Sequence, residues 1–133
     1  MNDQQRNIDI VARIAELWNA DDFDGLLELY DEDVEVVTDP GWPEPPVRGK
    51  GAFARMSRDW REAWEKIEVD PGAVRAVGPD RVLAEGRWHS RGAASGLSSE
   101  MAFGILYTIR DGKVVHQQWF LDPSEARRAA GLG

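Results

Sequence analysis

Asp39 is the side chain that the sequence places best for acid–base chemistry. It follows a β-branched run at residues 34–37 and precedes Pro40, in a segment with four prolines between residues 40 and 46. A proline cannot donate to a sheet ladder, and the residue before it is held extended, so a strand should end with Asp39 straight. A carboxylate fixed there beside Trp42 is a candidate general base. The alternative is an aspartate that begins a turn.

Four further polar residues are candidates for the same chemistry. Strict alternation along residues 82–91 places Glu85, Arg87 and His89 on one face, and Glu100 lies on the next expected strand. A carboxyl group in an apolar hollow would have its pKa raised toward a working range. Arg87 could then offset a developing negative charge. The alternative is that these residues form an exposed polar face.

The composition argues against several other classes of protein. The chain has no cysteine and two histidines, which lie on different expected strands without ligand spacing, so we expect no metal site and no cofactor. A net charge of −8 argues against nucleic acid or an anionic membrane as partner. The polar N-terminus and the lack of an apolar run of ~20 residues favour a cytoplasmic protein.

The elements that must position these residues follow from periodicity. Apolar spacing of three and four predicts helices, and β-branched or alternating runs predict strands. Asp122-Pro123-Ser124-Glu125 is typical of a helix start, and Asp111-Gly112 of a hairpin turn. Asp21 and Asp22 can cap the second helix, and Asp70-Pro71-Gly72 is typical of a turn. The expected helices are 5–19, 23–30, 50–66 and about 123–130, and the expected strands are 34–37, 73–77, 82–91, 98–110 and 113–121, with a further strand possible at 67–69.

This order predicts an α+β fold in one domain spanning residues 1–133, with an antiparallel sheet and helices on one face. Two orientations of the long strands stay open. The face Met101, Phe103, Ile105, Tyr107 and Ile109 packs against the helices, or it lies outside in a subunit interface and leaves Ala102 and Gly104 beside a hollow.

Three stretches carry a family resemblance: LWNADDFDGLLELYDEDVEVVTDP, VRGKGAF and IRDGKVVHQQWFLDPSEARRAAGL. They resemble the SnoaL-like polyketide cyclase branch of the nuclear transport factor 2-like superfamily. The resemblance implies a cone-shaped, curved antiparallel sheet that wraps three N-terminal helices around a pocket, with a short C-terminal helix. The superfamily includes isomerases, cyclases, lyases and non-catalytic binders, so the resemblance predicts the fold better than the reaction.

Similarity to ketosteroid isomerase assigns roles residue by residue. Asp39 matches the general base, whereas Ile14 and Gly104 stand where the oxyanion-hole tyrosine and aspartate would be, so steroid isomerisation is not expected. The same comparison predicts that the side chains of Glu85, Arg87 and His89 point into the pocket.

These inferences combine into one hypothesis, a cofactor-independent acid–base enzyme of isomerase, cyclase or lyase type that acts on an apolar or aromatic molecule. The alternative is a non-catalytic small-ligand-binding or dimerisation domain. A homodimer through the outer sheet face, with Met101–Ile109 as its apolar surface, is expected under both. The predicted catalytic residues are Asp39, His89 and Arg87, and the predicted substrate-binding residues are Trp18, Trp42, Trp60, Glu85, Glu100, Gln117 and Trp119.

Overall fold

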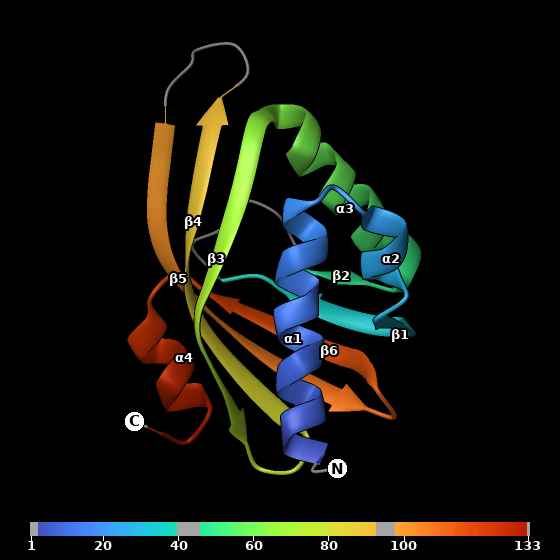
Figure 1. Cartoon of the computed structure of the whole chain (residues 1–133), viewed down its shortest axis with the longest axis vertical. Helices are drawn as coiled ribbons and strands as arrows, with labels where there is room; N and C mark the ends of the chain where they lie inside the picture. The colour runs from blue at the N-terminus through green and yellow to red at the C-terminus, as the bar shows by residue number, and fades with distance from the viewer. Residues whose placement is uncertain (1–2, 40–45, 93–97, 133) are drawn as a thin grey trace.

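The α+β prediction is confirmed by a computed structural model, which describes residues 3–39, 46–92 and 98–132 (Figure 1). Its six-stranded sheet has the order β2-β1-β6-β5-β4-β3. The elements are α1 (Asp3–Asn19), α2 (Phe23–Leu27), β1 (Tyr30–Val37), β2 (Val47–Arg48), α3 (Lys50–Ala63), β3 (Trp64–Val77), β4 (Arg81–Gly92), β5 (Ser98–Arg110), β6 (Lys113–Phe120) and α4 (Pro123–Ala129). No helix in the described ranges is long and apolar enough to cross a membrane.

The sheet is mixed, so the expectation of a purely antiparallel sheet is wrong for one pair of strands. β1 runs parallel to β6, with Tyr30 opposite Val114 and Val36 opposite Gln117. Parallel neighbours need a long crossover, and here α3 and the β3–β5 meander supply it. The short strand β2, which was not predicted, pairs antiparallel with the outer edge of β1.

Two element boundaries differ from the predicted ones. The second helix ends at Leu27, and Tyr30 begins β1, since an aromatic residue fits a pleated surface as well as a helix. The third helix ends at Ala63, and β3 continues through the predicted turn at residues 70–72 as a bulge. Gly72 permits the bulge because its φ is +57° and a Cβ there would lie 2.2 Å from the Glu85 carbonyl oxygen.

The predicted caps and the hairpin turn are confirmed. Asp22 caps α2 by accepting the Gly25 amide hydrogen at 3.0 Å, and Asp122 caps α4 by accepting that of Ser124 at 2.9 Å. Asp111 and Gly112 both have positive φ and join β5 to β6.

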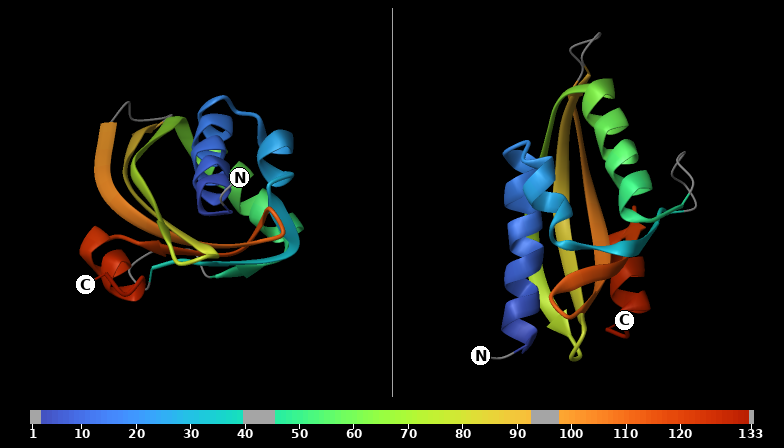
Figure 2. Two further views of the ribbon diagram at one scale, coloured as in Figure 1. Left: turned by 60° about the horizontal axis from the view of Figure 1, so that its bottom comes forward. Right: turned by 90° about the vertical axis from the view of Figure 1, so that its right-hand side faces the viewer.

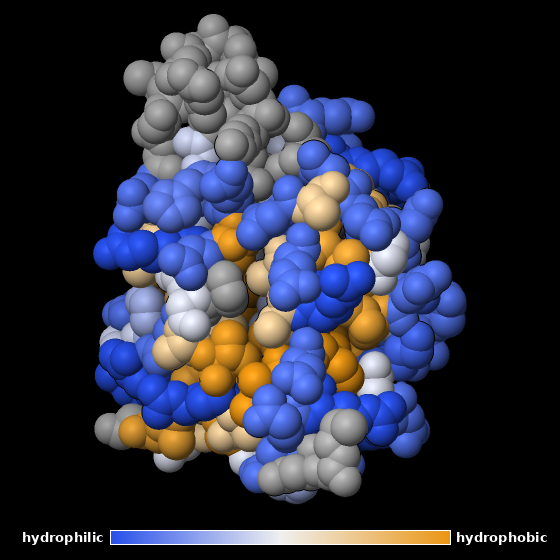
Figure 3. Space-filling model, in the orientation of Figure 1, coloured by the Kyte–Doolittle hydropathy of each residue, from blue (hydrophilic) through white to orange (hydrophobic). Residues whose placement is uncertain are grey.

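The curvature of the sheet creates an inner and an outer face. Helices α1 and α3 lie within the curve, and α4 lies outside it (Figure 2, left). Gly104 lets α4 approach the outer face, since a Cβ there would lie 2.5 Å from the Ala126 Cβ. The molecular surface on the α1 side is largely hydrophilic, with hydrophobic side chains showing between the polar ones (Figure 3).

Candidate functional site

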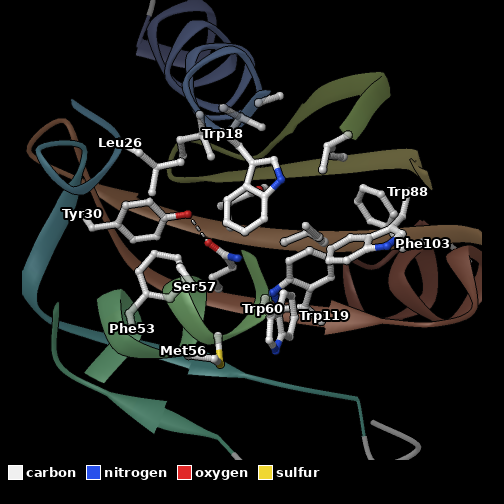
Figure 4. A pocket seen from close by; sticks show the side chains of 18 residues that line it. Trp18, Leu26, Tyr30, Phe53, Met56, Ser57, Trp60, Trp88, Phe103 and Trp119 are labelled. Carbon is white, nitrogen blue, oxygen red and sulfur yellow. Dashed lines mark hydrogen bonds between the residues drawn. The ribbon is translucent and has the colours of Figure 1, made fainter. Parts of the chain in front are cut away.

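The helices and the inner face enclose an apolar cavity of about 60 Å³ (Figure 4). At ~10–15 Å³ for each water molecule, it would hold roughly four to six waters, the size of one six-membered ring. The cavity lies between α1, α3 and the inner faces of β4, β5 and β6. Its lining residues are Val11, Ile14, Ala15, Trp18, Leu26, Tyr30, Phe53, Met56, Ser57, Trp60, Val69, Ala84, Trp88, Phe103, Ile105, Tyr107, Gln117 and Trp119.

Three indole rings form one wall of the cavity. Trp60 from α3 meets Trp88 from β4 and Trp119 from β6 edge-to-face, with ring centroids 5.3 and 6.0 Å apart. The ring centroids of Trp88 and Trp119 lie 6.2 Å apart, and the Phe103 ring lies 5.3 Å from that of Trp119 at an interplanar angle of 43°. These are preferred geometries for aromatic pairs, so the wall is both rigid and suited to a planar molecule.

The opposite end of the cavity carries two phenols and an amide. The Tyr30 hydroxyl donates to Gln117 Oε1 at 2.5 Å, and Tyr30 also packs on Phe53 with ring centroids 4.6 Å apart. Tyr107 lies directly opposite Gln117 in the sheet. Burial raises the pKa of both tyrosines well above 10.0, and the neighbouring Tyr107 raises that of Tyr30 further. Both phenols are therefore neutral and protonated near neutral pH.

Four of the predicted binding residues line the cavity, namely Trp18, Trp60, Gln117 and Trp119. Tyr30 and Trp88 also line it, although sequence reasoning missed both. Tyr30 was assigned to a helix. Trp88 was assigned to the face opposite Glu85, and the similarity to ketosteroid isomerase turned that face outward. A signal for Trp88 was present, because its alternating set of Val82, Ala84 and Gly86 is the more apolar of the two faces.

The predicted inward orientation of Glu85, Arg87 and His89 is wrong. β4 pairs in register with β5, and the buried residues Val82, Ala84 and Trp88 take the inner face, so the alternate residues must face outward. The helices impose this choice, because only the more apolar set can pack beneath α1 and α3. Glu85 instead pairs with Arg127 of α4 at 2.5 Å and with Arg75 at 3.5 Å.

Glu100 lies on the same outer face and joins the two remaining residues. Arg87 Nη1 lies 2.6 Å from Glu100 Oε1, and His89 Nδ1 lies 3.5 Å from Glu100 Oε2. All three side chains are about half exposed. The structure therefore gathers Arg87, His89 and Glu100 into one cluster, but on the side of the sheet away from the cavity.

Asp39 is held at the end of β1 rather than in the cavity lining. Its Oδ2 accepts the backbone amide hydrogen of Leu121 at 3.0 Å, which ties the end of β1 to the corner before α4. Trp42, predicted beside Asp39, lies outside the described residues. Asp39, Arg87 and His89 are not among the residues that line the apolar cavity described above, and the catalytic roles proposed for them stay predictions.

The face Met101–Ile109 points inward, so the argument that placed it in a subunit interface is wrong. Phe103, Ile105 and Tyr107 line the cavity and are each at most 5% exposed. The alternative in which this face packs against the helices was correct, and Gly104 lies beneath α4 instead of beside a hollow. Association of two chains through the outer face stays a prediction without that support.

Metal binding has no support in the described ranges, where no three His, Asp or Glu side chains gather closely enough to hold an ion. Each histidine instead faces one carboxylate, His89 that of Glu100 and His116 that of Glu35 at 3.3 Å.

A curved sheet that wraps helices around an apolar cavity is the architecture of the nuclear transport factor 2-like fold, which a solved nuclear transport factor 2-like protein from Burkholderia pseudomallei shares with a TM-score of 0.80. The chain belongs to the SnoaL-like domain family, whose sequence profile matches residues 11–117. No curated protein matches the chain.

Solved structures agree with this fold. A candidate polyketide cyclase from Xanthomonas campestris pv. campestris is 22% identical, with a TM-score of 0.81 over 97% of this chain and 99% of that one. A candidate SnoaL-like polyketide cyclase from Jannaschia sp. CCS1 is 19% identical, with a TM-score of 0.77 over 88% and 85%. TerC, co-crystallised with polyporic acid, is 19% identical, with a TM-score of 0.78 over 95% and 98%.

Proposed function

We propose that this protein binds a small, planar, largely apolar molecule in the cavity between α1, α3 and the sheet. The observation that carries the proposal is the cavity lining itself. It is built mainly from apolar and aromatic side chains, and the described residues contribute no Asp, Glu, His, Lys or Arg to it. A lining of this kind favours burial of an apolar ring and disfavours a charged ligand, which would lose its hydration without a counter-charge.

The size of the cavity limits the ligand class. A single aromatic ring fills about 60 Å³ when counted against water molecules, whereas a larger ring system would need the Trp60–Trp88–Trp119 wall to move. TerC, whose fold is similar, was co-crystallised with the small molecule polyporic acid, which supports small-molecule binding by this fold. Acetophenone, a single ring with one carbonyl, is therefore a suitable probe.

A pair of alanine variants on adjacent strands tests the proposal. Ala84 is 4% exposed and lines the cavity, whereas Ala102 is exposed on the outer face. Ala84→Leu adds three carbon atoms to the cavity and should abolish acetophenone binding, measured by quenching of tryptophan fluorescence. Ala102→Leu makes the same chemical change outside and should leave the Kd unchanged. Equal affinity in wild type and a folded Ala84→Leu variant would place the ligand elsewhere.

Acid–base catalysis is a second candidate function, favoured by the position of Asp39 at the end of β1 and by relatives that are named as candidate polyketide cyclases. In that case Asp39 would take a proton from a substrate whose ring fills the cavity and whose reacting carbon extends toward the end of β1. Asp39→Asn keeps the shape and can still accept the Leu121 amide hydrogen. Turnover of an identified substrate should then fall at least 100-fold, and unchanged turnover would remove Asp39 from the mechanism.

A further inference from the structure

Gln117 is the one amide side chain in the cavity lining of the described residues. It is 2% exposed and lies on the inner face of β6, between Val36 of β1 and Tyr107 of β5. An amide has an acceptor end and a donor end, so its orientation decides which kind of ligand group it can bind.

The contact with Tyr30 fixes that orientation. The amide oxygen Oε1 faces the phenol and accepts its hydrogen, with Tyr30 as donor. Tyr30 is 1% exposed and packed on Phe53, so it has little freedom to turn away.

The other end of the amide is consequently left for a ligand. Within the part of the chain that the structure describes, Gln117 makes no side-chain hydrogen bond besides the one to Tyr30, and the Tyr107 hydroxyl makes none. The indole N–H of Trp119 also has no hydrogen-bond partner there. A buried donor without an acceptor is costly, so a ligand acceptor that meets the Gln117 NH₂ group or the Tyr107 hydroxyl gains affinity.

We propose that Tyr30 determines the specificity of the cavity by holding the Gln117 amide with its NH₂ group toward the ligand. The cavity then prefers a ring that bears a hydrogen-bond acceptor, such as a carbonyl, over a ring that bears a donor, such as an amine. Tyr30 is a positioning residue in this account, since it acts through Gln117. The inference rests on the proposed function and names the substituent that the same site selects.

Two pairs of similarly shaped probes separate this effect from simple burial. Acetophenone and α-methylstyrene differ in a carbonyl oxygen against a methylene group, and aniline and toluene differ in an amino group against a methyl group. The quantity measured is the Kd ratio within each pair, by fluorescence titration. Comparing that ratio between variants cancels the different hydration of the probes.

Tyr30→Phe should change the Kd ratios of the two probe pairs in opposite directions. In Tyr30→Phe the amide can turn, so acetophenone should weaken about 3- to 10-fold relative to α-methylstyrene, and aniline should gain relative to toluene. Tyr107→Phe is the matched control, because it removes a phenol from the same cavity without freeing the amide. It should weaken acetophenone and give aniline no gain.

The outcomes distinguish the two proposals. If none of the four probes binds wild-type protein, the proposed function fails and this inference fails with it. If the probes bind but both ratios are the same in wild type and Tyr30→Phe, the inference alone is wrong. If Tyr30→Phe does not fold, as judged by circular dichroism, Gln117→Met provides the test instead. Loss of the amide should lower the preference for acetophenone over α-methylstyrene by the same 3- to 10-fold. An unchanged ratio would overturn the inference.

Discussion

The two faces of the sheet are built from the same strands but have opposite chemistry. On the inner face, Ala84, Trp88 and Phe103 surround a cavity whose polar groups are neutral phenols, an amide, a hydroxyl and indoles. On the outer face, at positions of the opposite parity on the same strands, Glu85 and Glu100 form ion pairs with arginines. Parity therefore decides the environment of a side chain, since one step along a strand moves it from the apolar cavity to a charged surface.

This difference separates the polar groups that can reach a ligand from those that cannot. The titratable residues that suggested catalysis lie mainly outside, where they join α4 to the sheet or pair across strands. The described residues that line the cavity carry no charge, so their polar groups can act on a ligand through hydrogen bonds and not through ionised groups. Variants on matching positions of the two faces can therefore test the comparison.

The largest expected effect is on the inner face. Phe103 is 1% exposed and stacks on Trp119, so Phe103→Ala should lower the free energy of unfolding by about 3–5 kcal/mol. Phe120 is only partly buried beside α4 on the outer face, and Phe120→Ala should cost clearly less. Urea denaturation measures both, and equal losses would show that the inner face does not dominate stability.

An added methyl group on the outer face should lower the free energy of unfolding less than the removal of a large side chain from the inner face. Gly104→Ala places a methyl group 2.5 Å from the Ala126 Cβ and should lower stability by about 1–3 kcal/mol as α4 shifts. Gly51→Ala is the control, because it lies in α3 with no described atom within 4 Å of an added Cβ, and there alanine should stabilise by up to about 1 kcal/mol. A neutral Gly104→Ala would mean that α4 is not closely packed.

The inner face should also make the protein sensitive to alkali. Burial raises the pKa of Tyr30 and Tyr107 in the folded state, while in the unfolded chain both titrate near 10.0. The unfolded state then loses protons first, so stability is complete below pH 10 and falls above it by about 1.4 kcal/mol per pH unit for each tyrosine. Urea titrations between pH 8 and 11 measure this slope.

The tyrosine contribution can be isolated, because the chain has only these two tyrosines. The double variant Tyr30→Phe/Tyr107→Phe removes both phenols and keeps every other titratable group of the chain, so its slope should be shallower. If wild type and the double variant lose stability in parallel above pH 10, the phenols are not buried as described.

The smallest effects concern ion pairs on the outer face. The Glu85 side chain is 12% exposed between Arg127 and Arg75, so Glu85→Gln should cost about 1 kcal/mol, and less at high salt. Glu100 is 52% exposed, and Glu100→Gln should cost about 0–0.5 kcal/mol. A larger loss at Glu100 than at Glu85 would reverse this order.

Much of the fold could be predicted from local signals. The sequence correctly predicted the helix caps at Asp22 and Asp122 and the turn at Asp111-Gly112, because these features depend on short-range hydrogen bonds and on φ. The parallel pairing of β1 with β6 could not be read in this way, since it depends on contacts between residues more than 80 positions apart. The bulge at Gly72 looked like a turn because both need a positive φ.

The site was predicted in part for a similar physical reason. Trp18, Trp60, Gln117 and Trp119 were placed correctly because their elements and parity were correct. Glu85, Arg87 and His89 were misplaced because the similarity to ketosteroid isomerase turned them inward, and an alignment that is shifted by one residue turns every side chain of a strand over. The pairing of Trp88 with Met101 and of Val82 with Tyr107 settles that parity in the structure.

The most direct test of the central claim is a titration of wild-type protein with acetophenone, followed by nitrogen–proton correlation spectra. We predict that the indole signals of Trp60, Trp88 and Trp119 shift together with one Kd, while the side-chain Nε–H signals of Arg75 and Arg127, which pair with Glu85 on the outer face, stay unchanged. Shifts confined to the outer face, or no shift of the three indole signals at saturating probe, would contradict the proposal that the inner cavity is the binding site.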